Sequence, residues 1–226
     1  MDMMLRAAPR PDRAAVILAA DGGVNVVAGE LEDIGTRLKE ERERVRISQR
    51  ELARRLGVSA SLISQIESGQ SKPSVSTLYA LVTELGVSLD SVFRGHANGR
   101  PEDGGPGHVP EPEADPVVHP GDRHVIDLAS GVRWERLTSH QQETVDFLHV
   151  VYEVGGSSSP DDKLMRHAGR EYGYVISGTL HVQIGFTERE LGPGDSIAFD
   201  STQPHRLWNT GNEPVHGIWF VVGRAG

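Results

Sequence analysis

The stretch SQRELARRLGVSASLISQIESG, residues 48–69, decides the fold of the first half of the chain. Ser48 followed three residues later by Glu51 predicts a capping box, in which the hydroxyl of Ser48 caps a helix and Glu51 reaches back to the Ser48 amide. Gly57 is placed to end that helix in a left-handed conformation, and Ser59 is placed to cap a second helix over 60–68. Two short helices joined by three residues have the spacing of a helix-turn-helix.

The flanking sequence extends this unit to a five-helix domain over residues 29–95. Apolar residues from Leu31 to Val45 recur on one helical face and predict a preceding helix. Beyond residue 69, Pro73 leads into a predicted helix over 76–85, and Ser88 caps a short fifth one. Residues 1–28 are predicted to be a disordered arm.

Composition restricts the compartment and the partners. The chain has 226 residues and no cysteine, which excludes disulfides and thiolate metal sites. The apolar run Ala14–Ala20 is too short to span a bilayer. We therefore expect a cytoplasmic protein that does not bind membranes.

The net charge of −9 lies entirely in the second half of the chain. Residues 96–226 hold ten basic and nineteen acidic side chains, whereas residues 30–95 hold ten of each. Eight of the basic residues fall between Arg37 and Arg55, so the first half can still present a surface to nucleic acid.

The second half begins after a change in composition. Residues 96–121 are rich in Gly, Pro and acids and are predicted to be a flexible linker. Residues 122–226 then alternate short apolar stretches with turn residues, which predicts an all-β sandwich or barrel. The expected strands are 125–128, 132–137, 147–154, 172–177, 180–186, 196–199, 205–209 and 215–222.

Residues 31–93 closely resemble the Cro/lambda-repressor-type (Xre family) helix-turn-helix, because residues 48–69, Lys72-Pro73-Ser74 and Leu78 agree with its pattern together. The resemblance implies that the helix over 60–68 enters the major groove of double-stranded DNA. Gln65 would pair with adenine, and Ala60 would touch a thymine methyl. The implied DNA contacts are Gln49, Ser59, Ala60, Ser61, Ser64 and Gln65, with Arg46, Arg50 and Lys72 at phosphates. Arg54 and Arg55 are further phosphate candidates. A plain helical bundle with a solvated basic face is the alternative.

Two later segments resemble the signature motifs of the cupin superfamily, a double-stranded β-helix or jelly roll. They are MRHAGRE (165–171), with Gly178 beyond it, and GPGDSIAF (192–199), followed by PHRLWN (204–209). The resemblance implies a metal held by His167, Glu171 and His205. Met165 stands where the family has another histidine. Two histidines and a carboxylate suit non-haem iron, and zinc or nickel would also fit.

The same resemblance implies a small-molecule pocket inside the barrel. Met165 would point into the cavity with His167, and Leu207 and Asn209 would share a side with His205. The predicted pocket residues are Met165, Tyr172, Tyr174, Phe199, Leu207 and Asn209. A barrel without metal, in which the histidines serve an organic effector or the fold alone, is the alternative.

The order of the two domains resembles a class of bacterial regulators in which a cupin sensor controls a DNA-binding dimer. It implies a non-enzymatic transcriptional regulator with a DNA operator, a small-molecule effector and a second copy of the chain as partners. An enzyme is the competing hypothesis, because hydroxypropylphosphonate epoxidase has the same domain order and a His, Glu, His iron site. A third hypothesis gives the cupin a role in dimerisation only.

Overall fold

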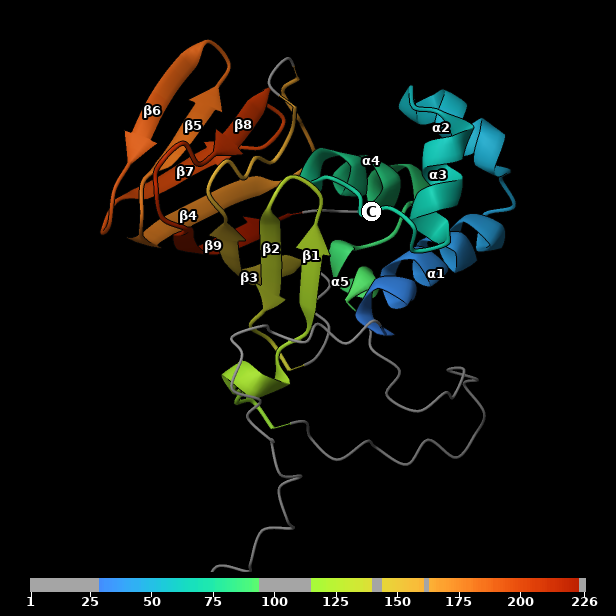
Figure 1. The fold of residues 1–226 in the computed structure, drawn as a ribbon, viewed down its shortest axis with the longest axis horizontal. Helices are drawn as coiled ribbons and strands as arrows, with labels where there is room; N and C mark the ends of the chain where they lie inside the picture. Colours follow the sequence, from blue (N-terminus) through green and yellow to red (C-terminus); the bar gives the residue numbers. More distant parts are fainter. Residues whose placement is uncertain (1–28, 94–114, 140–143, 161–162, 224–226) are drawn as a thin grey trace, which may run out of the picture.

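A computed structural model describes residues 29–93, 115–139, 144–160 and 163–223. The predicted arm over 1–28 and most of the predicted linker over 96–121 lie outside these residues. The described part consists of a helical domain followed by a β-sandwich (Figure 1). This order confirms the predicted fold class, while the domain boundaries themselves stay predictions.

The helical domain contains four helices of two turns or more and a single-turn fifth. Its helix-turn-helix consists of α2 and α3, as the serine and glycine pattern predicted. Ser48 accepts a hydrogen bond from the Glu51 amide, Gly57 ends α2 at φ 67°, and Ser59 caps α3 through the Leu62 amide. The helices are α1 (Gly29–Arg44), α2 (Gln49–Leu56), α3 (Ala60–Glu67), α4 (Val75–Leu85) and α5 (Leu89–Val92).

Only half of the predicted capping box forms. The Glu51 carboxylate accepts hydrogen bonds from Arg54 at 2.8 Å and from Arg55 at 2.7 Å. Guanidinium groups three and four residues along a helix form charge-assisted bonds, which are stronger than a bond to a neutral amide. The hydrogen bonds from the two arginines lower the pKa of Glu51 to about 2. Arg54 and Arg55, both predicted phosphate contacts, are therefore paired within the domain.

The β-sandwich is built from two antiparallel sheets. The larger sheet has the strand order β1-β2-β3-β9-β4-β7, and the smaller has the order β6-β5-β8. A short 3-10 turn at Pro120–Asp122 precedes them. The strands are β1 (Val125–Leu128), β2 (Val132–Arg136), β3 (Val145–Tyr152), β4 (Arg170–Ser177), β5 (Leu180–Ile184), β6 (Thr187–Leu191), β7 (Ser196–Asp200), β8 (His205–Trp208) and β9 (Val215–Val222).

One strand, β6, was missed by the sequence analysis. Its sequence Thr-Glu-Arg-Glu-Leu is exposed over its first four residues and has no apolar alternation. The strand forms because it folds back on β5, with Leu180 opposite Leu191 and Ile184 opposite Thr187. Pairing with a neighbour, which has no local signature, determines this strand.

The helical domain lies directly against the sandwich, and α4 makes a backbone contact with it (Figure 1). The Ser76 amide in α4 donates to the Ser158 carbonyl at 3.0 Å, and the Ala129 amide donates to the Pro73 carbonyl at 2.9 Å. The buried apolar residues of both domains form one cluster. Within the described ranges, every helix is too short or too polar to cross a bilayer.

Candidate functional site

The outer surface of α3 carries the residues predicted to read DNA. Ser61, Ser64 and Gln65 are exposed, and Ala60 is half-buried. Ser59 is exposed as well, although its hydroxyl already accepts the Leu62 amide at 3.1 Å. The inner face of α3 is buried through Ile63 and Ile66, so packing fixes which side of the helix meets solvent.

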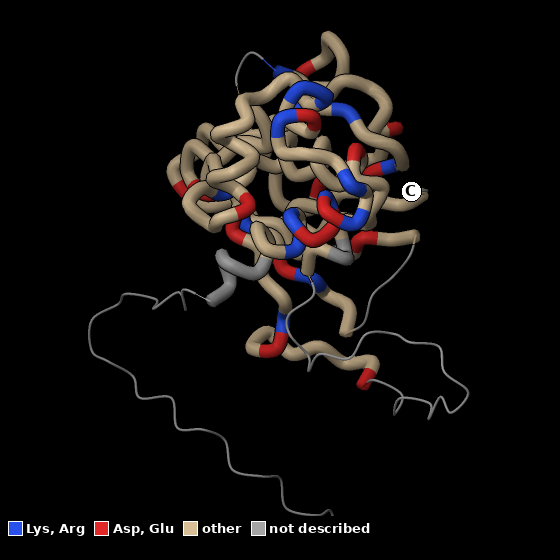
Figure 2. The backbone as a smooth tube through the Cα atoms, turned by 90° about the vertical axis from the view of Figure 1, so that its right-hand side faces the viewer, with Lys and Arg blue, Asp and Glu red and all other residues tan. Residues whose placement is uncertain are grey.

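The predicted phosphate contacts divide into two groups. Arg46 and Arg50 are exposed, and Arg46 has the left-handed φ of 59° at the end of α1. Lys72 instead lies half-buried with its Nζ 3.6 Å from an Asp127 carboxylate oxygen in β1. Figure 2 shows basic and acidic residues mixed along the face of the helical domain.

Gln49 takes part in a buried network that the sequence analysis did not predict. Arg42 donates to both carboxylate oxygens of Glu67, at 2.6 and 2.9 Å, and Gln49 Nε2 donates to Glu67 Oε2 at 2.8 Å. Arg42 also donates to the Ile47 carbonyl. The network ties α1, α2 and α3 together, and it holds the Gln49 amide at the start of α2.

The second predicted site is a cluster of three buried side chains inside the sandwich. Glu171 Oε1 lies 2.9 Å from His167 Nε2 and 3.1 Å from His205 Nε2. Glu171 comes from β4, His205 from β8, and His167 from the segment before β4. His205 is fully buried, and the other two are nearly so. The three predicted metal ligands therefore meet at one point.

Surrounding hydrogen bonds turn one atom of each ligand toward that point. His167 Nδ1 donates to the Ala168 carbonyl at 3.0 Å, and His205 Nδ1 donates to the Gln203 carbonyl at 2.8 Å. A carbonyl only accepts, so each neutral ring keeps a lone pair on Nε2. The Trp219 indole NH donates to Glu171 Oε2 at 2.8 Å and leaves Oε1 to the cluster.

These three facing atoms fit a metal ion. Among the described residues, His167 Nε2, Glu171 Oε1 and His205 Nε2 are buried and lack a well-aligned hydrogen-bond partner, despite their short mutual distances. A buried polar atom without a partner is costly, and a cation in the centre would satisfy all three at once. The donor set of two imidazoles and one carboxylate suits a divalent transition metal.

Charge in the cluster also favours a cation. Burial by itself raises the pKa of Glu171, but the two imidazoles outweigh that effect and hold its pKa well below the usual range. Burial lowers the pKa of His205, and the Glu171 carboxylate beside it reverses the shift and raises that pKa. The cluster therefore contains a carboxylate that stays ionised inside the protein.

The structure places three of the predicted pocket residues at or beside the cavity. Met165 and Leu207 line it with Glu171 and His205. Met165 pairs with His205 through two backbone hydrogen bonds, which puts its side chain next to the cluster. Phe199 is buried and packs edge-on against His205, with ring centroids 5.0 Å apart.

The other three pocket predictions are wrong. Tyr172 and Tyr174 are 43% and 49% exposed on the outer face of β4. Glu171 points inward, so its neighbours along a strand must point outward. Asn209 lies just beyond the end of β8, where strand alternation no longer applies. Its amide donates to the carbonyls of Tyr152 and Glu213 and organises a buried turn.

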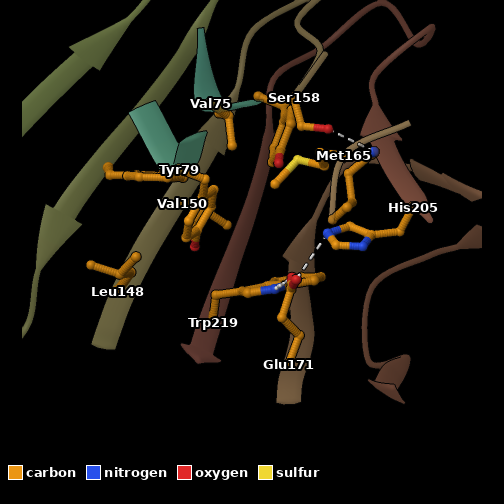
Figure 3. A pocket seen from close by; sticks show the side chains of 12 residues that line it. Val75, Tyr79, Leu148, Val150, Ser158, Met165, Glu171, His205 and Trp219 are labelled. Atoms are coloured by element: carbon orange, nitrogen blue, oxygen red, sulfur yellow. Dashed lines mark hydrogen bonds and ion pairs between the residues drawn. The ribbon is translucent and has the colours of Figure 1, made fainter. Parts of the chain in front are cut away.

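Part of the cavity wall comes from the helical domain. Val75 and Tyr79 of α4 point into the cavity (Figure 3). The Tyr79 ring stacks on His167, with centroids 4.0 Å apart and planes at 8°. Nothing local in α4 marks these residues, because their partners lie some ninety residues further along the chain. The barrel supplies the remaining residues that were missed, which are Trp134, Leu148, Val150, Tyr152, Ser158 and Trp219.

Comparisons with known proteins agree with both halves of the molecule. A helix-turn-helix family model matches residues 38–92, and a cupin domain model matches residues 148–221. The HTH-type transcriptional regulator PuuR of Escherichia coli is 28% identical over 78% of this chain and 87% of its own length. The E. coli regulator SutR is 22% identical over 81% and 90%.

A solved structure shares the fold across both domains. It is an HTH_3 family transcriptional regulator from Vibrio cholerae, with a TM-score of 0.58 and 21% identity over 86% of this chain and 97% of that one. The domain matches, the full-length relatives and the shared fold agree with one another. The chain therefore carries a helix-turn-helix domain followed by a C-terminal cupin domain, and it is similar over most of its length to HTH-type transcriptional regulators.

Proposed function

We propose that this protein binds a DNA operator through α3 and that a ligand in the cupin cavity controls this binding. The observation that carries the proposal is the presence, in one chain, of a capped helix-turn-helix with an uncovered α3 and a buried cluster built for a ligand. A regulator of this kind acts where the DNA is, so we place it in the cytoplasm.

Sequence readout rests on the exposed side of α3. The Gln65 amide offers a donor and an acceptor that match the N7 and N6 edge of adenine, and the Ala60 methyl matches the methyl group of thymine. Arg46 and Arg50 orient the domain through phosphates without reading sequence. Gln49, held by Glu67, presents a fixed amide at the edge of the same surface.

The cavity is proposed to hold one divalent metal, iron, zinc or nickel, on His167, Glu171 and His205. When bound, such an ion would supply a Lewis acid with coordination positions open to a ligand oxygen or nitrogen. Met165 adds apolar surface on the side where the family has another histidine. The protein itself buries the three side chains and fixes the direction of each donor atom.

A second copy of the chain is the proposed partner of the larger sheet. Its outer face carries a continuous row in which Phe147 of β3, Phe220 of β9 and Tyr172 of β4 are paired across the strands. The Phe147 and Phe220 rings stack at 4.4 Å, and Tyr174 and Ile176 extend the row in the open. Contiguous apolar surface of this kind marks an interface, and two-fold pairing is the commonest arrangement.

Selection of bound sequences from random DNA duplexes tests the proposal, with metal analysis on the same protein. We expect a pseudo-palindromic site, bound less tightly as salt rises. Gln65→Ala should weaken that site by about 1–3 kcal/mol and relax one base position. Gln70→Ala, exposed just beyond α3, is the matched control and should change nothing.

Failure to enrich any sequence would contradict the regulator. If stoichiometric iron were found at the same time, the competing hypothesis of an oxidative enzyme would lead. Enrichment from a protein without metal would assign the cluster to an organic effector.

A further inference from the structure

The cupin cavity is lined by the DNA-binding domain as well as by the barrel. Val75 and Tyr79 lie on successive turns of α4, line the cavity and are almost fully buried. Tyr79 stacks flat on the His167 ring and meets Trp134 edge-on, with centroids 5.6 Å apart and planes at 64°. One metal-ligand candidate, His167, is therefore covered by a side chain from the other domain.

Backbone contacts hold α4 in this place. The Ser76 amide belongs to the first turn of α4, where no helical carbonyl is available, and it donates to the Ser158 carbonyl of the barrel. Ser158 itself lines the cavity. The Ala129 amide donates back to the Pro73 carbonyl, and Lys72 faces Asp127. Residues 72–79 thus contact the sandwich through backbone hydrogen bonds and an ion pair.

The docked arrangement leaves almost no room for an organic ligand. The cavity has about 20 Å³ of free volume for a water-sized sphere. That is enough for about one water molecule. A metal ion on the three ligands fits such a space, whereas a metabolite requires one wall to move. Leu148, Val150 and Trp219 belong to β3 and β9, strands that are paired on both sides. Tyr79 instead belongs to α4, which is not part of a sheet.

We propose that Tyr79 fills the ligand position of the cupin site, so that ligand binding and docking of α4 exclude each other. The ligand would be a compact aromatic molecule whose flat ring takes the place of the Tyr79 ring on His167. The position of the Tyr79 ring is bounded by the face of the His167 ring and by the Trp134 ring, and such a slot selects a planar ring. This inference rests on the proposed function of the cavity as a ligand site.

Displacement of Tyr79 also affects the DNA-binding helix α3. Leu78, Leu81 and Val82 of α4 are also buried, and they belong to the apolar core of the helical domain. Because α4 is packed into the same core as α2 and α3, it leaves the barrel only together with the recognition helix. The ligand therefore acts by its different affinity for the docked and released arrangements.

Hydrogen exchange of the Ser76 and Ala129 amides in the full chain tests the docking directly. Both amides donate across the interface, so their protection reports its opening. Tyr79→Ala should lower the protection of both by on the order of tenfold, because it removes two ring contacts and leaves a void. Thr83→Ala, on the exposed side of α4, is the matched control. Tyr79→Leu keeps apolar volume without a flat ring, so its amide protection should lie between those of Tyr79→Ala and Thr83→Ala. This variant covers the case in which Tyr79→Ala fails to fold.

Phenol serves as the ligand probe, and cyclohexanol serves as its non-planar control. Phenol should bind Tyr79→Ala at least about tenfold more tightly than it binds the wild type, whose own ring fills the slot. Cyclohexanol should show no such preference. Equal phenol affinity in both proteins, or unchanged protection of Ser76 and Ala129 in folded Tyr79→Ala and Tyr79→Leu, would overturn the inference. If the phenol and hydrogen-exchange results were as expected but no operator sequence were selected, only the proposed function would be overturned.

Discussion

At the scale of single residues, the Arg42–Glu67 pair sets the geometry of the DNA-binding surface. Both side chains are more than nine-tenths buried, and Glu67 accepts hydrogen bonds from Arg42 and from Gln49. Buried ion pairs contribute little relative to apolar packing, but the loss of one partner leaves an uncompensated charge. The pair therefore specifies how α1, α2 and α3 meet.

Glu67→Ala should destabilise the protein by about 3–5 kcal/mol, because the Arg42 guanidinium would remain buried without its partner. Chemical denaturation followed by circular dichroism measures this change. Glu43→Ala is the control, since Glu43 also pairs with Arg42 but is 55% exposed. It should cost within about 0.5 kcal/mol. Equal losses in the two variants would show that the buried pair does not organise the domain.

At the scale of elements, β4 and β9 together orient the carboxylate of the cluster formed by His167, Glu171 and His205. Gly173 is paired with Trp219 across these strands. A Cβ at Gly173 would collide with the Trp219 indole, the same group that donates to Glu171 Oε2. The absence of a side chain at residue 173 therefore lets the indole lie where it orients Glu171.

Gly173→Ala should displace the indole, so that Glu171 loses the hydrogen bond that orients its carboxylate. The affinity for Ni²⁺ should then fall by about 10–100-fold, the usual effect of removing such a hydrogen-bond partner. Equilibrium dialysis with metal analysis measures it, and tryptophan fluorescence reports the movement of the ring. Gly121→Ala makes the same chemical change where a Cβ meets nothing within 4 Å, and it should leave the affinity unchanged. Retained affinity in Gly173→Ala would argue against orientation by Trp219.

Local signals explain which elements the sequence could predict. Capping serines and ending glycines mark the bounds of α2 and α3, because they act within one turn of chain. The strand at 215–222 was predicted with the bounds that the structure has, since it alternates apolar inward residues. The polar β6 was missed, because only its pairing with β5 defines it.

The site residues also divide into those with a recognisable sequence motif and those defined only by distant contacts. His167, Glu171 and His205 were found through the cupin resemblance, and the structure brings them together. The sequence analysis assigned Tyr172 and Tyr174 to the pocket. In β4, however, these residues alternate with the inward residues Glu171 and Gly173, so they point outward. Tyr79 was missed, because a contact between two domains leaves no pattern within either one.

At the scale of the whole molecule, the outer face of the larger sheet is expected to pair two chains. Tyr174→Asp should shift the protein toward monomer, because a charge would be buried at the interface without a partner. Light scattering over a concentration series measures this. Phe186→Asp is the control, since Phe186 is fully exposed at the β5–β6 turn. A dimer that survives Tyr174→Asp would place the interface elsewhere.

The central claim is that the cavity and the DNA-binding surface are coupled through α4. The most direct test is the dissociation constant of the selected operator for wild type and Tyr79→Ala at one salt concentration, with Thr83→Ala as control. The account predicts weaker binding by Tyr79→Ala, by about fivefold or more, because α3 in a released helical domain no longer has a fixed orientation relative to the cupin domain. Equal dissociation constants for the wild type and Tyr79→Ala would contradict it.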